Sequence, residues 1–249
     1  MIFTLRPRAD EHARPDGLFR DWQAAAWFAQ VEWPADFEPV YDWKMQTSVA
    51  IRVKIVDEVT ERFVATRAAP LVVELGAGLS TRASRLGLSR MQWLAVDLPV
   101  TIAFRQQFAL EEVSSQQIAG SVLETAWLDQ LPPAQGEEVL FIAEGLLSFF
   151  EREQVAALIE RLRTRFPGAT FTGDVMGEAN RANAGRRLEA IGAPAHWFVS
   201  DEQELADLEL SLVNVWPLIA QYPHRWGELA QWAADPVLRN SSLIFEARL

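Results

Sequence analysis

One stretch decides the fold of this chain: Glu74-Leu75-Gly76-Ala77-Gly78-Leu79-Ser80-Thr81. It completes an apolar, β-branched run that begins at Leu71, which predicts a buried strand ended by a glycine turn. Glycines let the backbone approach a ligand closely, and a helix start offers free N–H groups. Ser80 can cap the helix that follows. The stretch therefore predicts a strand, a turn and a helix built around a nucleotide-type ligand.

An acidic residue strengthens this interpretation. Asp97 ends the next predicted strand, 19 residues beyond Gly78. A carboxylate there can accept hydrogen bonds from both ribose hydroxyls of a nucleoside. A dinucleotide-binding turn needs a third small residue, glycine or alanine, where this chain has Thr81, and a phosphate-binding loop needs a Gly-Lys-Ser/Thr run that does not follow here. The motif therefore favours a nucleoside site over either of these.

Strands and helices alternate along the chain after Pro70. Short apolar runs predict strands at 71–75, 91–97, 116–120, 138–143 and 169–174. Helical spacing and helix-end signals predict helices at 22–29, 50–59, 80–88, 99–110 and 151–166. Alternation of this kind is typical of a parallel sheet covered on both faces by helices. Two more strands, at 210–215 and 241–248, are expected near the end of the chain.

The chain divides into two expected parts. Residues 1–68 predict a helical N-terminal cap that covers the ligand, and residues 69–249 predict the α/β domain. Insertions in this domain, at about 176–200 and 216–240, hold several tryptophans. We expect them to form lids beyond the strand ends, where open α/β sheets bind ligands.

The composition limits the partners. Asp and Glu number 34 against 23 Lys and Arg, and the net charge of −11 repels phosphate backbones and anionic lipid, so we expect no nucleic-acid and no membrane partner. The absence of cysteine excludes disulfides, thiolate metal sites and thiol nucleophiles, and no metal is expected. No apolar run approaches roughly 20 residues and no leader-like segment is seen, so we expect a cytoplasmic location.

Three runs together resemble one known family, the leucine carboxyl methyltransferase superfamily with its bacterial polyketide O-methyltransferase branch of tetracenomycin type. They are Val73–Ala83, Val96-Asp97-Leu98-Pro99 and Ala143-Glu144-Gly145-Leu146-Leu147, and segments 14–18 and 52–57 add weaker similarity. The resemblance implies a class I methyltransferase fold, Rossmann-like, that binds S-adenosylmethionine. Its sheet would be seven-stranded and mostly parallel, with an antiparallel last strand.

The resemblance also implies which residues bind the cofactor: Arg52, Glu74, Gly76, Gly78, Asp97, Leu98, Ser121, Val122 and Glu144. Arg52 would hold the cofactor carboxylate, with Lys44 as a weaker candidate, and Asp97 would hold the ribose diol. Glu144 would lie near the amino group and the methyl. Simpler roles stay open: Arg52 could pair with Asp57 or Glu58 on its own helix, and Glu144 could cap the next helix.

Two positions depart from the family's pattern. Ser80 stands where the family more often has an aspartate, and serine also caps helices. After Gly120 the family often has an acidic residue near the adenine, where this chain has Ser121, so the adenine amino contact would come from Ser121 or from the backbone. Leu98 would cover one adenine face, with Val122 and Leu123 near its edge.

Methyl transfer is an in-line displacement in which the protein mainly aligns the acceptor and excludes water. A carboxylate acceptor is ionised and needs no base, whereas a hydroxyl is helped by one. His196 is the candidate base, with His224 second, although both could be surface histidines; Asp174 is expected to be a turn or cap residue. We therefore expect an O-methyltransferase acting on a small-molecule carboxylate or hydroxyl, in secondary metabolism, and leave a homo-oligomer open.

Two alternatives remain. An NAD-linked oxidoreductase is disfavoured by Thr81 and by the lack of an obvious Ser-Tyr-Lys group, because the only tyrosines are Tyr41 and Tyr222. A non-catalytic module that binds the nucleoside is the other alternative. It would retain affinity for the cofactor without turnover of any acceptor.

Overall fold

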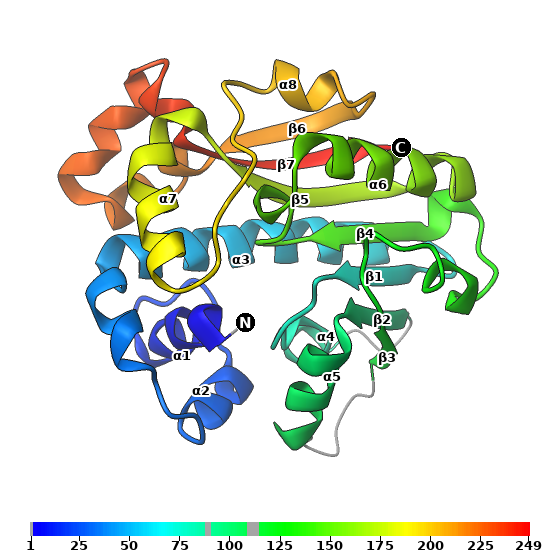
Figure 1. Ribbon diagram of the computed structural model, residues 1–249, viewed down its shortest axis with the longest axis horizontal. Coiled ribbons are helices and arrows are strands. Elements are labelled where there is room, and N and C mark those ends of the chain that lie inside the picture. The colour runs from blue at the N-terminus through cyan, green and yellow to red at the C-terminus, as the bar shows by residue number, and fades with distance from the viewer. Residues whose placement is uncertain (1, 88–90, 109–114) are drawn as a thin grey trace.

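The computed structural model describes residues 2–87, 91–108 and 115–249, and its centre is a seven-stranded sheet of order β3-β2-β1-β4-β5-β7-β6 (Figure 1). The strands are β1 Leu71–Leu75, β2 Gln92–Asp97, β3 Gln116–Ala119, β4 Val139–Ala143, β5 Thr170–Met176, β6 Ser211–Pro217 and β7 Ser242–Arg248. β7 is antiparallel to both of its neighbours, and the other pairs are parallel. The predicted sheet, with its antiparallel last strand, is confirmed.

Apolar cores lie on both faces of the sheet, as the near-continuous apolar strands require. Val73 of β1 belongs to a core that includes the buried side of α6 (Arg152–Arg165). Its neighbour Val72 belongs to a second core, which includes Ile51 of α3 (Trp43–Ala65). Successive strand residues point to opposite faces, so these two helices cover the sheet from either side.

Two predicted helices are shorter than expected. α4 spans Arg82–Leu86 and ends at Gly87, whose φ of +59° is the left-handed conformation of a helix C-terminus. α5 spans Pro99–Arg105 and continues into a 3₁₀ turn at Gln106–Phe108. The last positions of the two predictions, 88 and 109–110, lie outside the described residues.

The N-terminal segment contains α1 (Leu5–Ala13), α2 (Trp22–Phe28) and the long α3. The carboxylates of Asp21 and Asp42 cap α2 and α3 by accepting backbone N–H groups at 2.9 Å. The helix predicted at 50–59 is the middle of α3. Because Ile51 of α3 lies in the second core, α3 packs on the sheet, and the covering of the ligand by residues 1–68 stays a prediction.

Two segments, one on each side of β6 in the sequence, contain the remaining helices. The first contains α7 (Arg181–Ala190) and α8 (Gln203–Ala206). The second contains four 3₁₀ turns: η8 Leu218–Ala220, η9 Pro223–Arg225, η10 Gly227–Ala234 and η11 Leu238–Ser241. Figure 1 shows α1 and α7 on the side toward which the arrows of β1 and β4 point. Among the described residues, no helix is both long enough and apolar enough to cross a membrane.

Candidate functional site

The glycine turn after β1 needs its glycines. Gly76 and Gly78 have φ values of +62° and +51°, in the left-handed region that side chains disfavour. A Cβ placed on Gly76 would lie 2.6 Å from Cδ1 of Leu146, so the neighbour would have to shift. The Gly76 N–H donates to the carbonyl of Val96 at 2.8 Å, which ties the turn to β2.

Asp97 holds this turn from the end of β2. Its Oδ2 accepts the Gly78 N–H at 2.7 Å, and its Oδ1 accepts the Leu98 N–H at 2.7 Å. Both carboxylate oxygens retain lone pairs for further donors. The parallel register that places Leu75 opposite Val96 brings Asp97 beside the turn, as the sequence predicts.

A cavity of about 820 Å³ opens beyond the carboxyl ends of β1, β2, β4 and β5. Six of the nine predicted cofactor-binding residues line it: Arg52, Glu74, Gly76, Gly78, Asp97 and Glu144. The structure does not place the three predicted adenine contacts in this lining. Leu98 is half-exposed beside Asp97, Ser121 follows β3, and Val122 is buried in the core. Their contact with adenine stays a prediction.

His196, the predicted base, is not in the lining of this cavity. Its Nδ1 lies 3.2 Å from Oε1 of Glu151, and 43% of its side chain is exposed. His224 is also exposed, in η9. A catalytic role for either histidine stays a prediction, and the geometry adds no support for it.

A buried network of ion pairs forms the floor of the cavity. Arg82 donates to Glu74 at 2.5 Å, to Asp57 at 2.8 Å, and to Glu144. Arg52 lies between Glu144 and Asp174, with 3.2 Å from nitrogen to oxygen in each pair. Burial alone would raise the pKa of Glu144, but the charges of Arg82 and Arg52 lower it to about 2. Glu144 is therefore an anion at neutral pH.

The alternative partners considered for Arg52 are wrong. Asp57 pairs with Arg82 and Arg85, and Glu58 pairs with Lys54. Residues five and six positions apart do not face each other on a helix, whereas Lys54 and Glu58 are four apart. Arg52 therefore pairs with the carboxylates Glu144 and Asp174 near the strand ends rather than with Asp57 or Glu58 of its own helix.

Asp174 is part of the ion-pair network, although the sequence predicted only a turn or cap residue. It lies inside β5 rather than in a turn after it, and its Oδ1 accepts the Gly145 N–H at 2.6 Å. Burial raises the pKa of its carboxyl despite the neighbouring Arg52. The position of Asp174 near the end of the strand next to β4 could have indicated this site, because the ends of parallel strands lie at one edge of the sheet.

Arg8 was not predicted at all. This side chain of α1 is only 5% exposed and reaches the glycine turn, where its Nη2 donates to the Leu79 carbonyl at 2.7 Å and its Nη1 to Thr81 Oγ1 at 3.0 Å. Arg8 also lines the cavity. No local sequence motif predicts a contact between α1 and a turn more than 70 residues away.

We expect the free energy of unfolding to fall in acid, because Glu144 becomes protonated. Its pKa is lowered from 4.5 to about 2 by folding, so its contribution to stability is complete above about pH 4.5 and is lost as the pH falls toward 2. The full shift corresponds to about 3–4 kcal/mol. Urea unfolding between pH 3 and 6 should show this loss, and Glu144→Gln should flatten the slope. An unchanged slope in the variant would contradict the assignment.

The cavity continues into an apolar half away from the glycine turn. Its walls come from α7 and the 3₁₀ turns before β7: Ala184, Leu188, Ile191, Leu218, Ile219, Trp226, Leu229, Trp232 and Leu238. Trp232 lines the cavity and is 39% exposed. Trp226 also borders it but is buried in the second core, and Trp197 is buried in the first core. The tryptophans of the predicted lids therefore divide between pocket and core.

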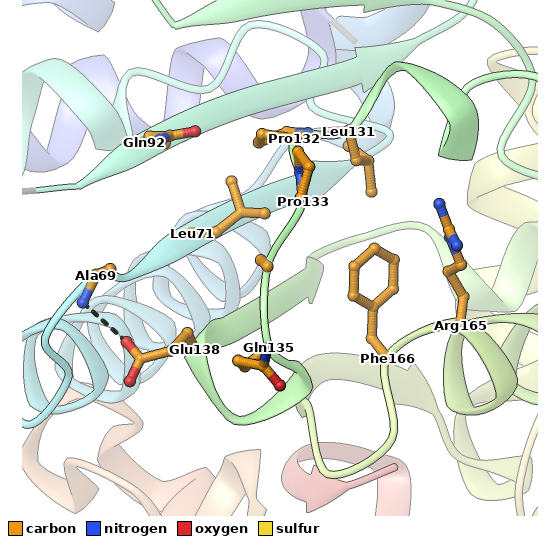
Figure 2. A pocket seen from close by; sticks show the side chains of 11 residues that line it. Ala69, Leu71, Gln92, Leu131, Pro132, Pro133, Gln135, Glu138, Arg165 and Phe166 are labelled. Atoms are coloured by element: carbon orange, nitrogen blue, oxygen red, sulfur yellow. Dashed lines mark hydrogen bonds between the residues drawn. The ribbon is translucent and has the colours of Figure 1, made fainter.

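A second cavity of about 500 Å³ lies at the opposite end of the strands, where β1 and β2 begin (Figure 2). Figure 2 shows Pro132 and Pro133 along one wall and the Glu138 carboxylate turned to the Ala69 N–H, with which it bonds at 2.9 Å. Open α/β sheets bind ligands at the carboxyl ends of their strands. The larger cavity is therefore the candidate site. No group of three or more side chains suited to a metal ion occurs in the described parts of the chain.

Comparison with known proteins gives a consistent assignment. The leucine carboxyl methyltransferase family matches residues 4–163. A similar curated protein is the tetracenomycin polyketide synthesis O-methyltransferase TcmP of Streptomyces glaucescens, which is 27% identical over 213 residues, covering 82% of this chain and 76% of that protein.

Solved structures agree in fold. Magnesium protoporphyrin IX methyltransferase (ChlM) from Synechocystis PCC 6803, with bound SAH, has a TM-score of 0.54 at 15% identity, covering 86% of this chain and 92% of that chain. The LepI complex with SAM has a TM-score of 0.50 at 13% identity, covering 76% of this chain but 45% of that longer chain. Since the family match spans more than half of the sequence, the chain belongs to the leucine carboxyl methyltransferase family of S-adenosylmethionine-dependent methyltransferases.

Proposed function

We propose that the protein transfers a methyl group from S-adenosylmethionine to an oxygen of a small molecule, a carboxylate before a hydroxyl, in secondary metabolism. One observation carries the proposal: a single cavity joins the glycine turn and its carboxylates to an apolar half walled by α7 and by the turns before β7. The likeness to TcmP, named for polyketide synthesis, supports the acceptor class.

The residues of the first half fit the cofactor. The turn at Gly76 and Gly78 approaches without side chains, and Asp97 has lone pairs left for the ribose diol. Glu144 supplies negative charge where the ammonium and sulfonium groups would be held. Arg52 would pair with the cofactor carboxylate while its other nitrogens keep Glu144 and Asp174.

The bound cofactor would supply an activated methyl group, so the protein needs to align the acceptor and exclude water. Among the described residues, no histidine lines the cavity. Asp174 lines it, and burial raises the pKa of its carboxyl. A carboxylate acceptor requires no proton removal. This favours a carboxylate over a hydroxyl as the methylated group.

Thr81 argues against the oxidoreductase. Where a dinucleotide site has a small residue, Thr81 is 2% exposed and its Oγ1 donates to Asp21 at 2.6 Å. A buried side chain of this size at the third position does not suit the close helix–strand packing of a dinucleotide site.

Calorimetric titration with S-adenosylhomocysteine tests the cofactor. We expect micromolar binding, no comparable binding of NADH, and a loss of about 10–100-fold in Asp97→Ala, because hydrogen bonds to a charged group are removed. Asp97→Asn keeps one acceptor for the turn and should lose less. Glu153→Gln, on the exposed start of α6, is the control.

Two outcomes would contradict the proposal. Folded protein that binds NADH but not S-adenosylhomocysteine would favour the oxidoreductase. Binding of S-adenosylhomocysteine without methyl transfer to any of a panel of aromatic acids and phenols would favour the non-catalytic module.

A further inference from the structure

We infer that the acceptor carries a second anionic group, a carboxylate that is not methylated and that pairs with Arg187 and Lys44 at the end of the cavity remote from the glycine turn. The inference rests on the proposed function and names its substrate class. It assigns the recognition of this group to two side chains from different parts of the chain.

Both cations line the cavity and share one partner. Nη2 of Arg187, on α7, lies 2.5 Å from Oδ2 of Asp42, and Nζ of Lys44 lies 3.7 Å from the same oxygen. The other oxygen of Asp42 caps α3 by accepting the Met45 N–H at 2.9 Å. Within the described ranges, neither cation has another acidic partner in an ion pair. One carboxylate thus faces two cations, and the site keeps one net positive charge.

This charge is separate from the cofactor end. Lys44, Ser48 and Arg52 follow one another at four-residue spacing on α3, and all three line the cavity. At 1.5 Å of rise per residue, the backbone positions of Lys44 and Arg52 lie about 12 Å apart. Lys44 pairs with Asp42, whereas Arg52 pairs with Glu144 and Asp174, so the two cations belong to different ion-pair clusters of the cavity. The paired anion therefore belongs to the far end of the acceptor.

The wall between the two ends suits an apolar body. None of the residues of α7 is buried, yet Ala184, Leu188 and Ile191 face the cavity. Trp226 and Trp232 border it from the C-terminal turns. An aromatic acceptor would cover these surfaces, and flat rings pack well on tryptophan.

The negative net charge of the protein contrasts with the positive charge of Arg187 and Lys44 in the cavity. With a net charge of −11, the general field repels anions. Partial burial would raise the pKa of Asp42, but the hydrogen bonds from Arg187 and from the Met45 N–H, together with the charges of Arg187 and Lys44, outweigh it and lower the pKa. Asp42 is therefore ionised at neutral pH. A local excess of positive charge in the pocket therefore selects an anionic group against the general field.

The test compares anthraquinone-2-carboxylate with anthraquinone-2-carboxamide, which differ in charge and little in shape. Binding to full-length protein saturated with S-adenosylhomocysteine is followed by quenching of tryptophan fluorescence, since Trp226 and Trp232 line the cavity. We expect the acid to bind about 10-fold more tightly than the amide, and added salt to weaken the acid alone.

Two variants are expected to change the affinity for the acid in opposite directions. Arg187→Gln should remove most of the preference and leave the affinity for the amide within about 2-fold. Asp42→Asn keeps the helix cap but removes the competing charge, so it should tighten binding of the acid. Arg186→Gln is the matched control, because Arg186 is exposed on the same helix and does not line the cavity.

An acid that binds no better than its amide, including binding of neither, would overturn the inference. So would an equal loss of acid affinity in Arg186→Gln, because the surface field would then explain the preference. Failure of S-adenosylhomocysteine to bind in the accompanying titration would instead refute the proposed function, and with it the acceptor role of the cation pair. Binding of S-adenosylhomocysteine without a preference for the acid would refute the cation pair alone.

Discussion

Replacement of Arg82 by glutamine is expected to destabilise the protein by about 3–5 kcal/mol, because it leaves buried carboxylates without their counterion. Arg82 is 3% exposed and pairs with Asp57, Glu74 and Glu144. The three carboxylates together hold the pKa of its guanidinium above the usual value, despite burial. Urea unfolding at pH 7 measures the loss as a lower midpoint at a similar slope.

The pH dependence separates this cause from a simple packing defect. Without the charge of Arg82, which lowers the pKa of Glu144, that carboxyl would ionise less readily, so the difference from the natural protein should shrink as the pH falls below about 5. Arg152→Gln, at the exposed start of α6, is the control and should change stability by less than about 0.5 kcal/mol. A deficit in Arg82→Gln that stays constant with pH would contradict the electrostatic explanation.

The parts of the site that are local in sequence could be predicted. The glycine turn follows a strand of five buried apolar or paired residues, and its conformation depends on its own glycines. Asp97 was predictable because adjacent parallel strands place their ends at the same edge. The antiparallel β7 was expected from the resemblance to a family, since apolar runs alone do not give strand direction.

The parts that join distant segments could not be predicted. Arg52 reaches carboxylates 92 and 122 residues away, and which of them it meets depends on how α3 crosses the sheet. Helical spacing could have excluded Asp57 and Glu58, which the sequence analysis left open, but it could not have identified the true partners. Asp174 was underrated because its strand extends two residues beyond its apolar run. The apolar half of the cavity depends on the positions of α7 and four 3₁₀ turns, which no residue pattern specifies.

The attachment of the N-terminal segment can be tested by a single change. We expect Arg8→Gln to weaken the binding of S-adenosylhomocysteine by about 10–100-fold, because charge-assisted hydrogen bonds hold the glycine turn in place. Arg8 joins α1 to Leu79 and Thr81, and Asp21 lies 3.4 Å from its Nη1. Calorimetry on protein of verified folding measures the change.

This variant tests the cap more cleanly than deletion of residues 1–68, because that deletion also removes the core side chain Ile51 and would unfold the sheet. Arg14→Gln is the matched control. Arg14 lies in the same segment, but its partner is the exposed Asp16. Because the turn at Gly76 and Gly78 is held by Asp97 on one side and by Arg8 on the other, loss of either should raise the Kd. Unchanged affinity in folded Arg8→Gln would mean that the other contacts, from Asp97 and from Arg105 to the Gly78 carbonyl at 2.9 Å, suffice to position the turn. The cap would then not contribute to cofactor binding through Arg8.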